Sequence, residues 1–210
     1  MYRLTINGAV HEIAEDGSLL DYLRDTADIT SVKNGCAEGV CGACTVLIDG
    51  RTARACIQKI SRLDGKSVTT LEGLSERERD IYAWAFGAAG AVQCGFCIPG
   101  MVMSAKGLLD VNASPSTAEI KAALKGNLCR CTGYVKIERA VAMAAEALRD
   151  PGFLPPKDPF DRPYALGERM PRLDAREKTL GTGKYVEDLK MPGMLYGITK
   201  IGRASCRERV

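Results

Sequence analysis

The sequence predicts an α+β fold in which a small mixed sheet with one helix is followed by four helices. Up to about residue 74, short segments alternate apolar and polar side chains with the period of two that strands require. From residue 75 onward, apolar residues recur at the helical spacing of three and four. Two sets of four cysteines, one in each part, fall in the predicted loops and at the strand ends.

The first part is predicted to begin with a hairpin. Residues 2–6 form one strand and residues 9–13 the return strand, because Asn7-Gly8 between two alternating segments is a strong hairpin signal. His11, the only histidine, is expected to be an exposed residue of the return strand. A helix is predicted to begin at Ser18, with Asp21 in its first turn and Leu19, Leu20 and Leu23 on its buried side. Further strands are predicted over residues 45–48, 51–57 and 68–70.

The cysteines of the first part are Cys36, Cys41, Cys44 and Cys56, spaced Cys-x4-Cys-x2-Cys with a later fourth cysteine. This spacing is typical of plant-type [2Fe–2S] ligation, and thiolates suit iron–sulfur clusters or zinc. Glycines between them fit such a loop, since a chain wrapping three thiolates round a small cluster needs positive φ in places. Antiparallel pairing of the second hairpin would bring Cys44 and Cys56 together.

Four helices are predicted in the second part, and the short loops between them indicate an up-down antiparallel bundle. They cover residues 75–90, 98–109, 116–126 and 134–149. Pro99 fits the first turn of the second helix. Ser116 and Glu119 form the pattern of a capping box that opens the third.

The cysteines of the second part lie in two of the loops between these helices. Cys94 and Cys97 precede the second helix, and Cys129 and Cys131 precede the fourth. In an up-down bundle these two loops emerge at the same end, so the four thiols are expected to converge on one metal site. Neither cysteine set matches the paired Cys-x2-Cys knuckles of a zinc ribbon, although zinc stays open as the alternative, above all for this second set.

Composition excludes several classes of protein. No apolar run approaches the ~18 residues of a membrane span, and the N-terminus lacks the apolar core of a signal peptide. We therefore expect a reducing, cytoplasmic setting, where nine cysteines favour metal ligation over disulfides. The net charge of +3 is too small to indicate nucleic-acid binding, and the sequence contains no basic stripe interleaved with aromatics.

Taken together, the two cysteine sets resemble the iron–sulfur part of the molybdenum hydroxylases, the family of xanthine dehydrogenases and aldehyde oxidoreductases. The resemblance covers about residues 2–150 and rests on the eight cysteines in order and on the segments 93–100 and 127–134. It implies a β-grasp, plant-type [2Fe–2S] ferredoxin domain over residues 1–74 and an all-α four-helix [2Fe–2S] domain over residues 75–155.

The resemblance also implies roles for individual residues. The outer cluster, on the solvent side, would be held by Cys36, Cys41, Cys44 and Cys56. The inner cluster, nearer the molybdenum cofactor, would be held by Cys94, Cys97, Cys129 and Cys131. Gln93 would hydrogen-bond the pterin of the molybdopterin cofactor, and Cys131 would lie beside the pterin edge. An ordinary polar residue at a helix terminus is the alternative for Gln93.

Residues 156–200 are expected to be a linker and the beginning of a molybdopterin-binding domain. Residues 151–163 hold five of the nine prolines, which is typical of an extended linker. Residues 181–197 resemble the opening of the molybdopterin domain, and such a direct connection is found in flavin-free aldehyde oxidoreductases of anaerobic bacteria. A phosphate loop at Gly183-Lys184 is excluded, because the earlier glycine is missing and Tyr185 replaces the Ser or Thr.

The activity implied by the resemblance is hydroxylation of an aldehyde or a xanthine-like N-heterocycle with oxygen from water. Electrons would pass from the molybdenum cofactor through two [2Fe–2S] clusters to a flavin subunit or a carrier protein, while the catalytic residues lie in the missing molybdopterin domain. That domain is the main expected partner, within a homo-oligomer or a multi-subunit complex. The alternatives are a free-standing iron–sulfur subunit or ferredoxin-like carrier, and a zinc-stabilised interaction module.

The last ten residues, 201–210, resemble the conceptual translation of a common sequencing adapter. We expect the natural sequence to be interrupted near Lys200, with a genuine basic terminus as the alternative. Without these residues the net charge falls from +3 to +1. In either case Cys206 is not counted as a ligand.

Overall fold

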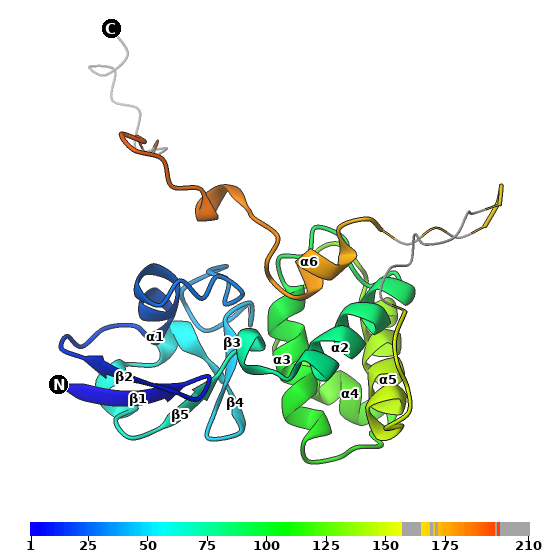
Figure 1. Ribbon diagram of the computed structural model, residues 1–210, viewed down its shortest axis with the longest axis horizontal. Helices are drawn as coiled ribbons and strands as arrows, with labels where there is room; N and C mark the ends of the chain where they lie inside the picture. Colours follow the sequence, from blue (N-terminus) through cyan, green and yellow to red (C-terminus); the bar gives the residue numbers. More distant parts are fainter. Residues whose placement is uncertain (157–164, 169, 171, 196, 198–210) are drawn as a thin grey trace, which may run out of the picture.

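The computed structural model describes residues 1–156, 165–168, 170, 172–195 and 197. The sheet and the helical part lie side by side, and the segment that carries α6 (Ala175–Thr179) lies over the helices and continues toward the first part (Figure 1). Part of the predicted linker and the whole of residues 201–210 fall outside the described residues.

The sheet has five strands in the order β2-β1-β5-β3-β4. Their bounds are β1 Tyr2–Ile6, β2 Ala9–Ile13, β3 Thr45–Ile48, β4 Arg51–Arg54 and β5 Ser67–Thr69. Strands β1 and β5 pair in parallel and all other neighbours pair antiparallel, so the sheet is mixed, as predicted. Both hairpin turns have positive φ at their two central residues, which Asn-Gly and Asp-Gly tolerate.

Strand β4 is shorter than predicted. It ends at Arg54, and the 3-10 turn η2 (Ala55–Ile57) replaces the last three residues of the expected strand. The Ala55 N–H still donates across the hairpin to the Cys44 carbonyl at 3.1 Å, and the chain then turns as the Gln58 N–H donates to the Ala55 carbonyl at 3.1 Å. This turn brings Cys56 back toward Cys44. Strand β5 also lies one residue earlier than predicted.

The helix predicted at Ser18 begins where expected but is very short. Helix α1 (Leu19–Asp21) passes into the π-turn η1 (Tyr22–Thr26), and the three predicted leucines are buried. The Ser18 side chain makes no capping hydrogen bond, since its residue forms an isolated bridge with Lys59. His11 is only half-exposed, because its Nδ1 lies 3.0 Å from the Tyr22 hydroxyl, so the prediction of an exposed histidine is wrong.

The four predicted helices of the second part all form, with ends within two residues of those expected. They are α2 Glu76–Ala88, α3 Ile98–Leu109, α4 Thr117–Leu124 and α5 Val135–Arg149. Ser116 and Glu119 make both hydrogen bonds of the predicted capping box. Helix α2 packs against α5, α3 against α4, and α4 against α5. Short 3-10 turns complete the described elements at η3 (Ile60–Arg62), η4 (Leu71–Gly73) and η5 (Val186–Asp188).

Two clusters of buried apolar side chains support these parts. One lies between the sheet and α1, and the other lies among α2, α3, α4 and α5. Leu47 of β3 belongs to the helical cluster, and α3 packs on β3, so the two parts share a packed boundary. No helix among the described residues is long and apolar enough to cross a membrane.

Candidate metal centres

The first cysteine set lies in the loop before β3 and on the turn after β4. The four thiols converge: hydrogen-bond contacts join Cys36 to Cys41 and Cys44 to Cys56, and Cys41 also interacts with both Cys44 and Cys56. Register explains the second pair: Thr45 lies opposite Arg54, Cys44 directly precedes Thr45, and Cys56 follows Arg54 by two residues, so both cysteines lie at this end of the β3–β4 ladder. The convergence predicted from the hairpin is therefore confirmed.

Main-chain N–H groups point at the sulfurs of this set. Glu38 and Cys41 each donate to the Cys36 Sγ at 3.4 Å, and Gly39 donates to the Cys56 Sγ at 3.2 Å. The donors on Cys36 lower the pKa of its thiol to about 6. Burial has the opposite effect on Cys44 and raises the pKa of its thiol to about 12. The loop thus favours a thiolate at its exposed side and needs a bound cation to ionise its buried side.

Glycine is required in this loop by close approach. A Cβ atom added at Gly35 would lie 2.9 Å from the Cys41 Sγ. Gly42 has φ +72°, and a Cβ there would collide with the main-chain carbonyl of Gly126 in the second part. The prediction of positive φ in the cysteine loop is confirmed. At Gly42 the close approach of the second part is a further reason why only glycine fits.

The second set comes from the two loops that the bundle was expected to bring together. The Cys94 Sγ lies 3.6 Å from the Cys131 Sγ, and the thiol of Cys97, at the start of α3, interacts with that of Cys129. The predicted meeting of the loops is confirmed. Burial and the adjacent Cys129 raise the pKa of the Cys97 thiol, whereas Cys94 and Cys131 are exposed.

The loop after Cys129 is built around that residue's sulfur. The Thr132 hydroxyl lies 3.0 Å from the Cys129 Sγ, and the N–H groups of Thr132 and Cys131 approach it at 3.4 and 3.5 Å. Burial works against ionisation, but these donors outweigh it and lower the pKa of the Cys129 thiol. The Tyr134 hydroxyl accepts the Cys129 N–H at 2.8 Å. Sequence reasoning did not identify Thr132 and Tyr134, although both lie in the segment that carried the resemblance.

The paired arrangement of the sulfurs decides which metal group they fit. Among the described residues, no three or more His, Cys, Asp or Glu side chains form a group that would hold one metal ion. The direct thiol contacts join the cysteines of each set in two pairs, and a [2Fe–2S] cluster has two irons that each take two protein ligands. The N–H donors suit the anionic sulfurs of such a group. The thiol contacts and the N–H donors of both sets therefore fit a binuclear cluster.

The two cysteine loops also contact each other. The Leu128 N–H, next to Cys129, donates to the Cys41 carbonyl at 2.8 Å. The buried Asn127 side chain donates to the Gly42 carbonyl at 2.9 Å and accepts from the Ser104 hydroxyl at 2.7 Å. One hydrogen bond therefore connects a cysteine residue of the first set to the neighbour of a cysteine in the second.

Gln93 lies immediately before the second set, and its side chain is exposed. Within the described part of the chain, no hydrogen bond to this side chain is formed. Together with the exposed Cys94 and Cys131, it leaves one side of the second set open.

Two models of protein families match the chain. The model described as "2Fe-2S iron-sulfur cluster binding domain" matches residues 10–81, and the "[2Fe-2S] binding domain" model matches residues 70–142. Each match contains one complete cysteine set.

Curated relatives fall into two kinds. The chain is 47% identical over 146 residues to the nicotinate dehydrogenase small FeS subunit of Eubacterium barkeri, and this match covers 68% of the chain and 93% of the relative. It is 41% identical over 204 residues to the aldehyde oxidoreductase of Megalodesulfovibrio gigas, which covers 90% of the chain and 22% of the relative. The chain thus spans most of a small subunit and about a fifth of the longer enzyme.

Solved structures show the same division. The aldehyde oxidoreductase of Desulfovibrio desulfuricans matches with a TM-score of 0.77 and 39% identity, over 89% of this chain and 22% of that one. The quinoline 2-oxidoreductase of Pseudomonas putida 86 matches with a TM-score of 0.65 and 41% identity, over 70% of this chain and 94% of that one.

Proposed function

Because the chain belongs to the molybdenum hydroxylase family as an iron–sulfur electron-transfer part, we propose that its eight ligand cysteines hold two [2Fe–2S] clusters. The observation that carries this assignment is the pairing of the thiols, two by two, under main-chain N–H donors. The outer cluster takes Cys36, Cys41, Cys44 and Cys56. The inner cluster takes Cys94, Cys97, Cys129 and Cys131.

Clusters in series turn a two-electron reduction at a molybdenum centre into single-electron transfers. The residues of this chain supply the connection between the two sets. The hydrogen bond from the Leu128 N–H to the Cys41 carbonyl is the short link between the loops, and Asn127 holds them at this distance from within the packed boundary. The expected direction of electron flow is from the second set to the first.

The finer proposal is that this chain continues into a molybdopterin-binding domain, as in the single-chain aldehyde oxidoreductases. Support comes from the share of the chain that is matched: 90% for the aldehyde oxidoreductase against 68% for the small subunit. A match of 90% extends beyond residue 155, into the segment that carries α6 and η5. We assign residues 156–200 to the linker and the start of that domain, and residues 1–74 and 75–155 to the two cluster domains.

In this arrangement the open side of the second set faces the molybdopterin cofactor. Gln93 would hydrogen-bond the pterin, since its exposed amide offers both a donor and an acceptor, and Cys131 would lie beside the pterin edge. The substrate class is an aldehyde or an N-heterocycle, and the acceptor is a flavin subunit or a carrier protein. A separate small subunit, as in the nicotinate dehydrogenase relative, is the second candidate and is favoured by the 93% coverage of that protein.

Metal analysis and EPR spectroscopy test the cluster assignment. The purified chain should be brown, contain about four irons and, after reduction, show two distinct EPR signals. Cys129→Ser should remove one signal, and Cys36→Ser should remove the other. A colourless protein containing zinc would refute the assignment, and the loss of both signals in either variant would contradict two independent sets.

The contact with the pterin is tested in the uninterrupted enzyme. Gln93→Ala should reduce the molybdopterin content after dialysis and leave the iron content unchanged. Gln58→Ala, a half-exposed glutamine directly after η2, is the control and should change neither. Equal molybdopterin retention in both variants would contradict the role of Gln93.

A further inference from the structure

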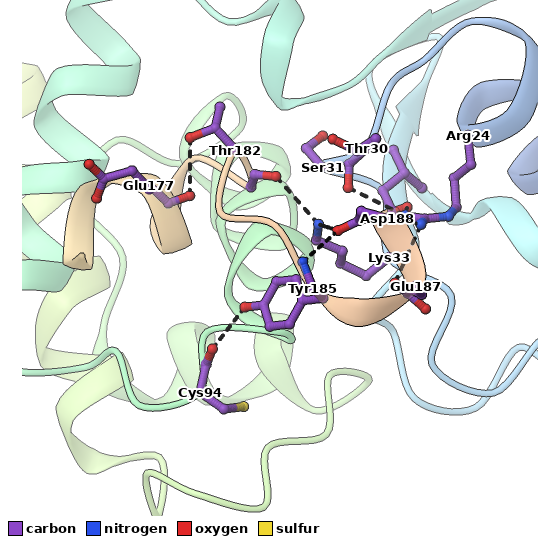
Figure 2. A network of polar contacts seen from close by, with 12 residues as sticks. Arg24, Thr30, Ser31, Lys33, Cys94, Glu177, Thr182, Tyr185, Glu187 and Asp188 are labelled. Carbon is purple, nitrogen blue, oxygen red and sulfur yellow. Dashed lines mark hydrogen bonds and ion pairs between the residues drawn. The ribbon is translucent and has the colours of Figure 1, made fainter. Parts of the chain in front are cut away.

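The segment with α6 and η5 contacts both parts of the molecule that carry cysteines (Figure 2). After α6 the chain turns at Gly181 and passes Tyr185. It reaches residues of the first part at Asp188, the last residue of η5. We call residues 181–188 the clamp. The cysteine sets do not need this segment for any ligand, so its contacts call for a separate explanation.

The first contact is with a buried lysine. The Lys33 side chain is fully buried, only three residues before Cys36. In the described part of the chain, every polar partner of its ammonium comes from the clamp: the Gly181 carbonyl at 3.4 Å and the Asp188 carboxylate at 3.5 Å. The same ammonium lies 4.8 Å from the centre of the Tyr185 ring. A buried cation without partners is strongly unfavourable, and the clamp supplies the partners of this one.

Arg24 adds a second cation at the same carboxylate. Its guanidinium lies 2.7 Å from Asp188 and 3.4 Å from Glu187. Asp188 is the shared partner because it is nearly buried and pairs with Arg24 and Lys33 at once, whereas Glu187 is more exposed and contacts Arg24 alone. The clamp therefore brings two carboxylates to the two cations of the first part, and Asp188 is the one that contacts both.

The turn of the clamp is packed between the two parts. A Cβ atom added at Gly181, which has φ +73°, would lie 2.6 Å from the Ser31 Cα and 3.3 Å from Pro99. Ser31 belongs to the first part, and Pro99 lies in the first turn of α3, just after Cys97. No side chain fits there, so the clamp lies in close contact with both parts at this point.

The last contact is with the Cys94 loop. The Tyr185 hydroxyl donates to the Cys94 carbonyl at 2.8 Å, and its ring packs edge to face on Phe96. The Lys178 ammonium lies 4.8 Å from the same ring, and a Cβ added at Gly95 would lie 2.6 Å from the Lys178 Cβ. Every residue from Cys94 to Phe96 is thus held by α6 or the clamp.

We propose that the clamp fixes the two cysteine loops relative to each other, with Asp188 as the charge partner of Lys33 and Tyr185 as a positioning residue for the Cys94 loop. The structural coupling stands on these contacts alone. The effect on the inner cluster rests on the proposed function, because it requires that Cys94 be a ligand.

Hydrogen exchange of the full 210-residue chain tests the coupling. Asp188→Asn should speed exchange of the Ile98 amide, which is bonded to the Gly95 carbonyl, by about fivefold, although Asp188 does not touch this loop. The matched control is Glu187→Gln, which should change this rate by less than about twofold. Equal rates in both variants would overturn the proposal.

If Asp188→Asn does not fold, a double variant tests the same coupling. Lys33→Met combined with Asp188→Asn removes both buried charges, which is tolerated better than removal of one. The pair should fold, retain both clusters and still show the faster exchange at Ile98. Wild-type exchange at Ile98 in the double variant would overturn the role of the ion pair.

Tyr185→Phe tests the positioning role, because it keeps the ring and removes only the hydroxyl. The midpoint potential and EPR signal of the inner cluster should shift, while those of the outer cluster stay unchanged. No shift, or the same shift in both clusters, would overturn this role. Absence of clusters in the wild-type protein would refute the proposed function, and the exchange experiment would still decide the coupling.

Discussion

Replacement of Asn127 by alanine should destabilise the packed boundary between the two cysteine-bearing parts. Asn127 is 3% exposed and Ser104 is 5% exposed, so the Ser104 hydroxyl loses its partner away from water. Such an unsatisfied group costs about 1–3 kcal/mol, and the lost bond to the Gly42 carbonyl adds about 1 kcal/mol. That carbonyl is not left unpaired, because Thr45 also donates to it. The expected cost is about 2–4 kcal/mol.

Thermal unfolding of the cluster-loaded chain measures this effect. For a chain of this size the midpoint should fall by about 4–16 °C. Asn112→Ala is the matched control, since its amide bonds Glu119 at 3.0 Å at an exposed position and should cost under about 1 kcal/mol. Ser104→Ala added to Asn127→Ala should recover part of the loss. Equal midpoints for the two asparagine variants would refute the claim that a buried amide joins the parts.

Two further results are expected. Gly42→Ala should lower the thermal midpoint at least twice as much as Gly50→Ala: both glycines have positive φ, but an added Cβ collides with a main-chain carbonyl only at Gly42. Similar midpoints would contradict this. Burial opposes ionisation of Asp188, yet the Tyr185 N–H and Arg24 outweigh it and hold the pKa of the carboxyl below its usual value. Its stabilisation should therefore be present above about pH 4 and be lost as the pH falls further, and Asp188→Asn should abolish that part of the acid dependence of the melting midpoint, measured from pH 6 to pH 3.

The clamp lies in the segment beyond the two cysteine-bearing parts and contacts both of them. Its contacts supply the charge partner of Lys33 and a hydrogen bond to the Cys94 loop. Comparison of chains with and without the clamp will show whether this segment fixes the position of the two cysteine loops relative to each other.

Local sequence patterns were sufficient to predict which elements form, within one to three residues for the strands and helices α2 to α5, and to find the two cysteine sets. Helices α2 to α5 and the strands follow local periodicity, and the capping box at Ser116 involves residues only three apart. The cysteine spacings are equally local, which is why all eight candidate ligands were identified before any fold was known. Local patterns report on residues within one or two turns, and these features lie inside that range.

The exact ends of elements such as β4, and the contacts between residues far apart in the sequence, became known only from the folded structure. Strand β4 stops at Arg54 because the chain turns into η2, where the Gln58 N–H bonds the Ala55 carbonyl, while the Ala55 N–H still bonds the Cys44 carbonyl across the hairpin. The Lys33–Asp188 pair joins residues 155 positions apart, and no periodicity marks either one. Such contacts depend on how whole elements pack and on what burial costs a charge, so they become visible only once the folded chain is known.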